Sequence, residues 1–262
     1  MTTVLPAGGG AHRSAAPAPH AVLLDMDGTL VDTEDFWWDA EVRVFAELGH
    51  TLREKDRRVV VGGPMTRSAN YLIEVTGADI AYEELAERLN AAFLARLDLG
   101  VTLMPGAAEL LADLSRHRVP AALVSASHRE VVDRMLRAIG AEYFALTIAG
   151  DDLTRTKPHP DPYLTAAIGL GADPAACVAV EDTATGVASA EAAGCRVLAV
   201  PSITALEPAP GRTVVDSLRG VDVGFLRGLW SHPLPPAPSG ATGGTAPEPR
   251  PGGRGRWNGS AR

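Results

Sequence analysis

The sequence has few cysteines, no long apolar run and a deficit of cations, and each shortage excludes a class of protein. Only Cys177 and Cys195 are cysteines. They lack a metal-ligand spacing and stand where strands are expected to begin, so we expect buried thiols in a reducing compartment. No apolar run reaches the roughly 20 residues that cross a bilayer. The net charge of -8 argues against nucleic acid as a partner, because a phosphate backbone attracts a surplus of lysine and arginine.

The two ends of the chain contain few residues that could pack. Residues 1–19 are rich in Ala, Gly and Pro and lack a basic start followed by an apolar stretch. We therefore expect an unstructured tail rather than a secretory signal, and a cytoplasmic protein. Residues 231–262 are rich in Pro and Gly and are expected to form a second such tail. Its arginines could instead contact an acidic partner.

Between the tails, short apolar runs alternate with segments of helical periodicity. Alternation of this kind predicts βαβ units, and hence a parallel sheet covered by helices on both faces. The fold class expected is α/β, with a Rossmann-like core formed by residues 20–33 and 103–230. The expected strands are 22–25, 121–125, 146–149, 177–180 and 196–200, and the expected helices are 106–117, 129–139, 162–170 and 186–193.

Residues 34–102 have a different pattern. Apolar residues recur at helical spacing after position 34, again over 68–75, and again over 82–99, and no strand of similar clarity interrupts them. This segment therefore predicts an all-helical domain inserted directly after the first strand. Trp37 and Trp38 could shape a pocket in this domain, although aromatic residues at helical spacing usually form its core.

Two carboxylates mark the end of the first expected strand. The apolar run from Val22 ends at Asp25 and is followed by Asp27 and Gly28. In open α/β sheets, ligands bind at the carboxyl ends of the strands. Two buried carboxylates need a cationic partner there. A divalent cation such as Mg2+, which prefers oxygen ligands, would supply it.

Residues 25–32, with the sequence DMDGTLVD, resemble the first motif of the haloacid dehalogenase superfamily. The resemblance implies that Asp25 is a nucleophile that forms an aspartyl-phosphate. It also implies that Asp27 is a general acid/base whose backbone carbonyl binds the metal. Dehalogenases resemble this motif but lack the second aspartate, so Asp27 favours phosphomonoester chemistry. Members with a small helical cap include sugar-phosphate phosphatases and β-phosphoglucomutase.

Residues 122–127 (ALVSAS) resemble the second motif of that family, an apolar strand that ends in a hydroxyl residue. Ser125 would bind the transferring phosphoryl group, and Ala126 and Ser127 could add amide or hydroxyl donors. Ser127 is equally well explained as a helix N-cap, because Glu130 completes a capping box with it.

Two further segments resemble the third and fourth motifs. Residues 156–162 (TKPHPDP) contain Lys157, which would hold Asp25 ionised and offset charge on the phosphoryl oxygens. Residues 178–186 (VAVEDTATG) contain Asp182, which would complete a magnesium site. Glu181 is either a further ligand or a group that holds a metal-bound water.

The helical insert is harder to interpret. Arg67 follows a Gly/Pro loop, residues 62–64, and could contact the substrate, but a solvated arginine is an equal alternative. By resemblance, residues 32–34 and 103–106 would be a hinge about which a cap closes and excludes water.

The motifs together predict a Mg2+-dependent phosphatase that acts on a small phosphorylated metabolite such as a sugar phosphate. A β-phosphoglucomutase-like isomerase is the alternative, but Trp37 stands where those mutases carry a histidine. A phosphate-binding regulatory module without catalysis is a lesser alternative, because none of the four motifs is damaged. Whether the protein is a monomer or a dimer stays open.

Overall fold

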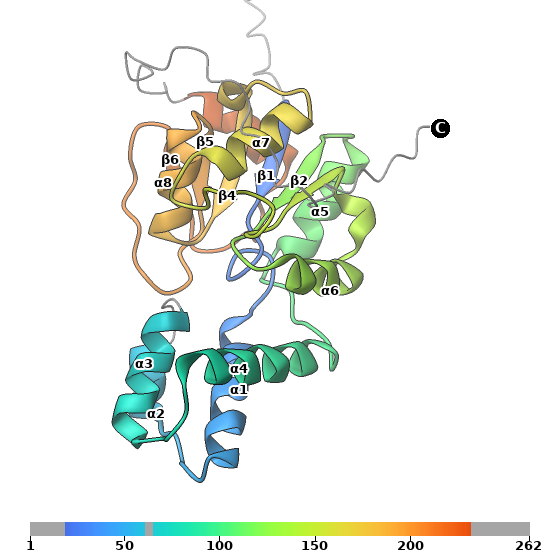
Figure 1. Ribbon diagram of the computed structural model, residues 1–262. Helices are drawn as coiled ribbons and strands as arrows, with labels where there is room; N and C mark the ends of the chain where they lie inside the picture. The colour runs from blue at the N-terminus through green and yellow to red at the C-terminus, as the bar shows by residue number, and fades with distance from the viewer. Residues whose placement is uncertain (1–18, 61–64, 232–262) are drawn as a thin grey trace, which may run out of the picture.

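Six parallel strands form a sheet at the centre of this computed structural model (Figure 1), which describes residues 19–60 and 65–231. The strands follow the spatial order β3-β2-β1-β4-β5-β6. They are β1 Ala21–Leu24, β2 Ala121–Val124, β3 Leu146–Ile148, β4 Cys177–Glu181, β5 Arg196–Ala199 and β6 Arg212–Val214. The prediction of a parallel sheet is confirmed. β6 was not expected, because its three residues are only half-buried and carry no long apolar run.

Helices cover both faces of the sheet because strand side chains alternate between the faces. Val22 and Leu24 belong to one apolar cluster, and Ala21 and Leu23 belong to the other. The first cluster is covered by α5 Ala107–Arg116, α6 Arg129–Ile139 and α9 Val223–Gly228, and the second by α7 Asp161–Gly169 and α8 Ala184–Ala192. Three short 3-10 helices, Ala141–Tyr143, Pro174–Ala176 and Leu229–Ser231, complete the core.

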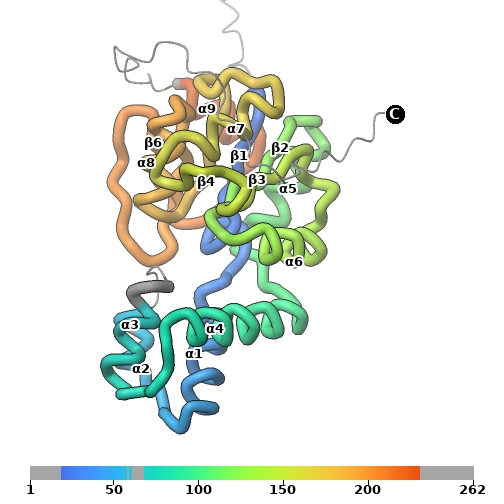
Figure 2. Tube along the Cα trace, viewed as in Figure 1, coloured from blue at the N-terminus to red at the C-terminus, as the bar shows by residue number. Residues whose placement is uncertain are grey.

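Within the described residues, four helices form a separate layer beside the carboxyl edge of the sheet, and we call them the cap helices (Figures 1 and 2). They are α1 Glu34–Glu47, α2 Glu54–Val60, α3 Met65–Thr76 and α4 Tyr82–Leu97. α2 was not expected, because its sequence EKDRRVV begins with charged residues. The described residues between α1 and α4 contain no strand. The expected fold class, an α/β core with an inserted helical cap, is confirmed.

Two chain segments connect the core to the cap helices, and they run side by side (Figure 2). The amide of Asp32 donates to the carbonyl of Thr102 at 3.0 Å, and the amide of Met104 donates to the carbonyl of Leu30 at 2.9 Å. This pairing ties both segments together next to Asp25. That they act as a hinge stays a prediction.

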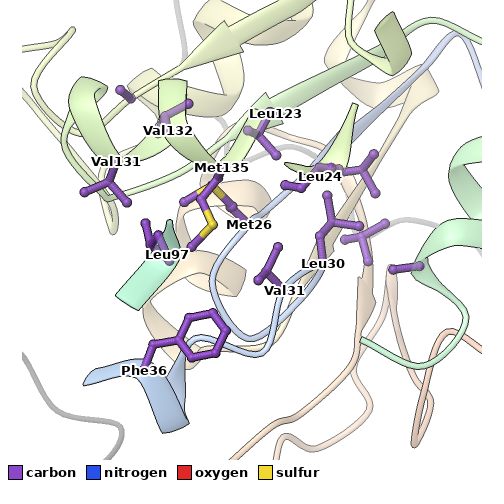
Figure 3. Packing of buried hydrophobic residues seen from close by; sticks show 14 of the residues in the cluster. Leu24, Met26, Leu30, Val31, Phe36, Leu97, Leu123, Val131, Val132 and Met135 are labelled. Atoms are coloured by element: carbon purple, nitrogen blue, oxygen red, sulfur yellow. The ribbon is translucent and has the colours of Figure 1, made fainter. Parts of the chain in front are cut away.

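One apolar cluster extends from the core into the cap helices (Figure 3). Phe36 of α1 and Leu97 of α4 belong to the same cluster as Val31 and Met135. The two layers are therefore packed together as well as connected by the chain.

No helix within residues 19–60 and 65–231 combines the length and the apolar character that crossing a bilayer demands. The expected tails, 1–19 and 231–262, lie outside the described residues except at positions 19 and 231.

Candidate active site

Side chains from three neighbouring strands meet at one edge of the sheet. Asp25 directly follows β1, Ser125 follows β2, and Asp182 follows β4. Because the strands are parallel, their carboxyl ends lie at the same edge. Asp25, Glu181 and Asp182 each offer an oxygen, and these oxygens lie within 4.8 Å of one another. Residues far apart in the sequence thus form one acidic cluster.

Lys157 comes from the loop between β3 and α7, and its ammonium group lies against this cluster. It donates to Asp25 Oδ1 at 2.6 Å, to Glu181 Oε1 at 2.5 Å and to the carbonyl of Val124 at 2.9 Å. Burial by itself lowers the pKa of Lys157, but the carboxylates of Asp25 and Glu181 outweigh that effect and raise the pKa above its ordinary value. Lys157 is therefore held as a cation beside Asp25.

Asp27 has different neighbours from Asp25. Its Oδ2 accepts hydrogen bonds from the hydroxyls of Ser125 at 3.1 Å and Ser127 at 2.8 Å. Burial raises the pKa of Asp27, and the serine hydroxyls lower it only in part. A carboxyl group with a raised pKa is suited to donating and accepting a proton.

The N-cap interpretation of Ser127 is wrong. α6 begins at Arg129 with His128 as its N-cap residue, and the amide of Arg129 donates to Asp151 Oδ1 at 2.7 Å rather than to Ser127. The Ser127 hydroxyl donates to Asp27 instead, and its amide donates to Ser125 Oγ at 2.9 Å. The buried carboxylate of Asp27 takes the hydroxyl that a capping box would have used.

The carboxylate of Asp182 has a hydroxyl donor on each oxygen. Thr29 Oγ1 donates to Oδ1 at 3.2 Å, and Ser202 Oγ donates to Oδ2 at 2.6 Å. Burial raises the pKa of Asp182 to about 6, although the Ser202 hydroxyl opposes the shift. Gly28 lies directly against Oδ2 with a φ of 79°, and a Cβ at that position would overlap the carboxylate. Only glycine allows this approach.

Comparison with known proteins agrees with this geometry. A family model described as haloacid dehalogenase-like hydrolase matches residues 22–200, from β1 through the insert to the end of β5. The chain belongs to the haloacid dehalogenase-like hydrolases. The match includes every acid of the cluster.

Three relatives show how far the likeness extends. The bifunctional riboflavin kinase/FMN phosphatase of Arabidopsis thaliana is 32% identical over 184 residues, which are 70% of this chain and 48% of that protein. Hexitol phosphatase B of Escherichia coli (strain K12) is 30% identical over 188 residues, which are 70% of this chain and 83% of that protein. The crystal structure of CbbY from Rhodobacter sphaeroides in complex with phosphate is 28% identical, with a TM-score of 0.67 over 79% of this chain and 98% of that one. The chain thus spans about half the length of the Arabidopsis protein and most of the length of the other two.

Glu181 of this haloacid dehalogenase-like hydrolase already has protein donors on both oxygens. Oε1 accepts from Lys157 and from the Tyr163 hydroxyl at 2.6 Å. Oε2 accepts from the amide of Asp182 at 3.2 Å and from the amide and hydroxyl of Thr183 at 3.4 and 3.2 Å. A Cβ on Gly186 would overlap this carboxylate, so that glycine permits a close approach. Glu181 accepts two bonds on Oε1 and three on Oε2, whereas Asp182 accepts one on each oxygen, so the outer-shell interpretation is favoured for Glu181.

The cluster has the composition that a divalent cation requires. Asp25 Oδ2 and Asp27 Oδ1 are buried and have no hydrogen-bond partner among the described residues. Burial, followed by the negative charge of Glu181, raises the pKa of Asp25 well above its ordinary value. The single ammonium of Lys157 therefore does not balance the buried acids around it. Asp25, Asp182 and the backbone carbonyl of Asp27 could hold Mg2+, whose charge would complete that balance.

The residues Thr29, Thr183, Tyr163 and Ser202 contact the cluster but were not predicted from the sequence. Thr29 lies inside the first motif but was given no role, and Tyr163 of α7 has the pattern of a core aromatic. Ser202 lies in the loop after β5, which resembles no motif. The strand order would have provided a signal, because β5 lies next to β4 and its carboxyl end must therefore lie next to Asp182.

Other predicted residues lie elsewhere or are not described. Residues 62–64 lie outside the described residues, and Arg67 falls in the first turn of α3 without a described side chain. Ala126 is exposed between the two serines. Trp37 stacks on Phe93 of α4 with ring centroids 4.0 Å apart, so it packs within the cap helices.

Proposed function

We propose that this protein is a Mg2+-dependent phosphatase that hydrolyses a small phosphomonoester, and that sugar and polyol phosphates are its substrate class. The observation that carries the proposal is the contrast between two aspartates two residues apart. Asp25 faces the Lys157 ammonium, and Asp27 faces two hydroxyls. Two carboxyls in such different environments are suited to two different roles.

In the proposed reaction, Asp25 attacks phosphorus and forms an aspartyl-phosphate. Asp27 donates a proton to the oxygen of the leaving group, and then removes a proton from the water that hydrolyses the intermediate. Lys157 offsets negative charge on the phosphoryl oxygens, and the Ser125 hydroxyl and the amide that follows it are donors to the same oxygens. Bound Mg2+ would supply further positive charge to the phosphoryl group.

The substrate class comes from the relatives together with the cap helices. Hexitol phosphatase B is named for a phosphorylated polyol, and the structure of CbbY holds phosphate. The cap helices adjoin the carboxyl edge of the sheet, where they would enclose a small substrate (Figure 1). The stacking of Trp37 on Phe93 supports hydrolysis over isomerisation, since that position offers no acid/base group.

The test is phosphate release from a panel of phosphorylated sugars, polyols and nucleotides with Mg2+. The wild type should release phosphate, and Asp25→Asn should release none although it still unfolds in one cooperative urea transition. Asp79→Asn, an exposed cap residue, is the matched control and should keep wild-type activity. Wild-type rates in Asp25→Asn would remove Asp25 as the nucleophile. If no compound yields phosphate but one is isomerised, the protein is a mutase instead.

A chelator tests the metal separately. Activity should vanish in excess EDTA and return when Mg2+ is added in excess. Full activity in EDTA would rule out the metal-dependent mechanism.

A further inference from the structure

Ser202 connects a loop of unassigned function to the candidate active site. The loop begins at Val200, whose amide donates to the carbonyl of Glu181 at 2.7 Å. Pro201 follows and fixes its own φ near -65°. Ser202 is the next residue, and its hydroxyl lies 2.6 Å from Asp182 Oδ2. The backbone bond and the proline place this hydroxyl beside the carboxylate.

The Asp182 carboxylate is thereby held on three sides. Thr29 donates to Oδ1, Ser202 donates to Oδ2, and the backbone of Gly28 lies against Oδ2. The χ2 torsion of an aspartate is otherwise broad, so the carboxylate plane would vary without these contacts. Each carboxylate oxygen can accept more than one bond, so both keep the capacity to bind a cation.

We propose that Ser202 is a positioning residue that orients Asp182 for binding Mg2+. The inference rests on the proposed function. Hydrogen bonds from outer-shell groups orient metal ligands, and losing one typically costs 10- to 100-fold in metal affinity. A hydroxyl donor also leaves the negative charge of Asp182 intact, whereas a lysine or arginine there would compete with the cation.

The exposure of Ser202 distinguishes a role in orienting Asp182 from a role in packing. Ser202 is exposed as a residue, and so are its neighbours Ile203 and Thr204. Removing one hydroxyl from an exposed residue leaves no cavity. An effect of the change on Mg2+ affinity would therefore come from the lost hydrogen bond.

The experiment compares Ser202→Ala, Ser202→Thr and Thr204→Ala with the wild type. Mg2+ binding is measured by isothermal titration calorimetry, and phosphate release is measured as a function of Mg2+ concentration. Ser202→Ala should weaken Mg2+ binding about 10-fold and raise the half-maximal Mg2+ concentration by the same factor. Its KM for the substrate at saturating Mg2+ should stay within about twofold of the wild type, as expected for a ligand-orienting group.

The two comparison variants sharpen the result. Ser202→Thr keeps a hydroxyl at the same atom position and should bind Mg2+ nearly as the wild type does. Thr204→Ala removes a hydroxyl from the same loop and should change nothing. Equal Mg2+ affinity in Ser202→Ala and the wild type would overturn the proposal, as would equal losses in Ser202→Ala and Ser202→Thr.

Failure of this inference can be distinguished from failure of the proposed function. A wild type that hydrolyses a phosphomonoester and binds Mg2+, with an unchanged Ser202→Ala variant, overturns only the role of Ser202. A wild type that neither binds Mg2+ nor releases phosphate overturns both.

Discussion

Lys157 in the core and Glu41 in the cap helices are both buried, but their surroundings are opposite in kind. In the core, the Lys157 ammonium contacts two carboxylates and a carbonyl. In α1, Glu41 is 6% exposed and accepts no hydrogen bond from any residue that the structure describes. Burial, and then the negative charge of Glu34, raise the pKa of Glu41 to about 7. A buried charge is tolerated where it has opposite partners and is costly where it has none.

The contrast follows from where the core and the cap helices place their charged side chains. The core gathers charge at the carboxyl edge of its strands, where ligands bind in α/β sheets. The cap helices place their ion pairs on the surface, as in the pairs Arg43–Glu47 and Arg88–Glu84. Asp56 of α2 is buried too, but it accepts from the amide of Arg53 and the hydroxyl of Tyr71, whereas Glu41 has no such donor among the described residues. Removing the Lys157 cation should therefore destabilise the core, whereas neutralising Glu41 should stabilise the cap helices.

The largest effect is expected for Lys157→Met. The change leaves Asp25 and Glu181 buried without their cation, and removing one partner of a buried pair typically costs about 3–5 kcal/mol. We expect the free energy of unfolding to fall by roughly that amount at neutral pH. Urea denaturation measures this change in the free energy of unfolding. Phosphate release should also be lost, because Lys157 then no longer offsets negative charge on the phosphoryl oxygens.

The chain provides a matched control, because Lys55 is its other lysine. Lys55 is exposed on α2, so Lys55→Met should change stability by less than about 0.5 kcal/mol. If Lys157→Met were as stable as the wild type, the core network would contribute no stability and the contrast with the cap helices would disappear.

An effect of opposite sign is expected for Glu41→Gln. An ordinary glutamate titrates near 4.5, but the pKa of folded Glu41 is about 7. Between these values the unfolded chain releases the proton while the folded chain keeps it, so wild-type stability falls as pH rises from 4.5 to 7. The glutamine side chain in the variant does not titrate. The variant should match the wild type near pH 4 and be about 2 kcal/mol more stable at pH 8.

Urea denaturation near pH 4 and at pH 8 checks both the sign and the size of this difference in stability. Glu74→Gln on α3 is the control, because Glu74 is exposed and its substitution should leave the pH dependence unchanged. A Glu41→Gln variant that is less stable than the wild type at pH 8 would reveal a favourable partner for this carboxylate.

The sequence was most informative where one residue both ends a strand and carries charge. An apolar run that stops at Asp25, and another that stops before Asp182, predict the sheet and its acidic edge together, because a carboxylate at the end of a buried strand needs a cation or hydrogen-bond donors beside it. The same local reasoning was wrong for Ser127, since Asp27 competes for its hydroxyl from 100 residues away. It could not find Ser202 or the burial of Glu41 either. Those depend on which strand or helix lies alongside, and only the packed structure fixes that.

The smallest effect on stability is expected for an exposed ion pair that joins the cap helices to the core. Asp98, directly after α4, pairs with Arg134 of α6 at 3.0 and 3.2 Å, but its side chain is 64% exposed and that of Arg134 is 28% exposed. Solvent screens such pairs, and Arg134 also bonds Glu130 at 3.2 Å, so its guanidinium stays partnered when Asp98 is lost. A double-mutant cycle with Asp98→Asn and Arg134→Met should give a coupling of about 0.5 kcal/mol or less.

The pair Arg88–Glu84, which lies within α4 alone, is the reference for that cycle. Equal couplings would mean that the cap helices are held to the core by the shared apolar cluster, in which Leu97 and Met135 lie together, and by the paired linkers. A coupling well above about 1 kcal/mol between Asp98 and Arg134 would instead mean that charge contributes to the junction as it does around Lys157. The division between a core organised by charge and a cap held by apolar packing would then fail at their boundary.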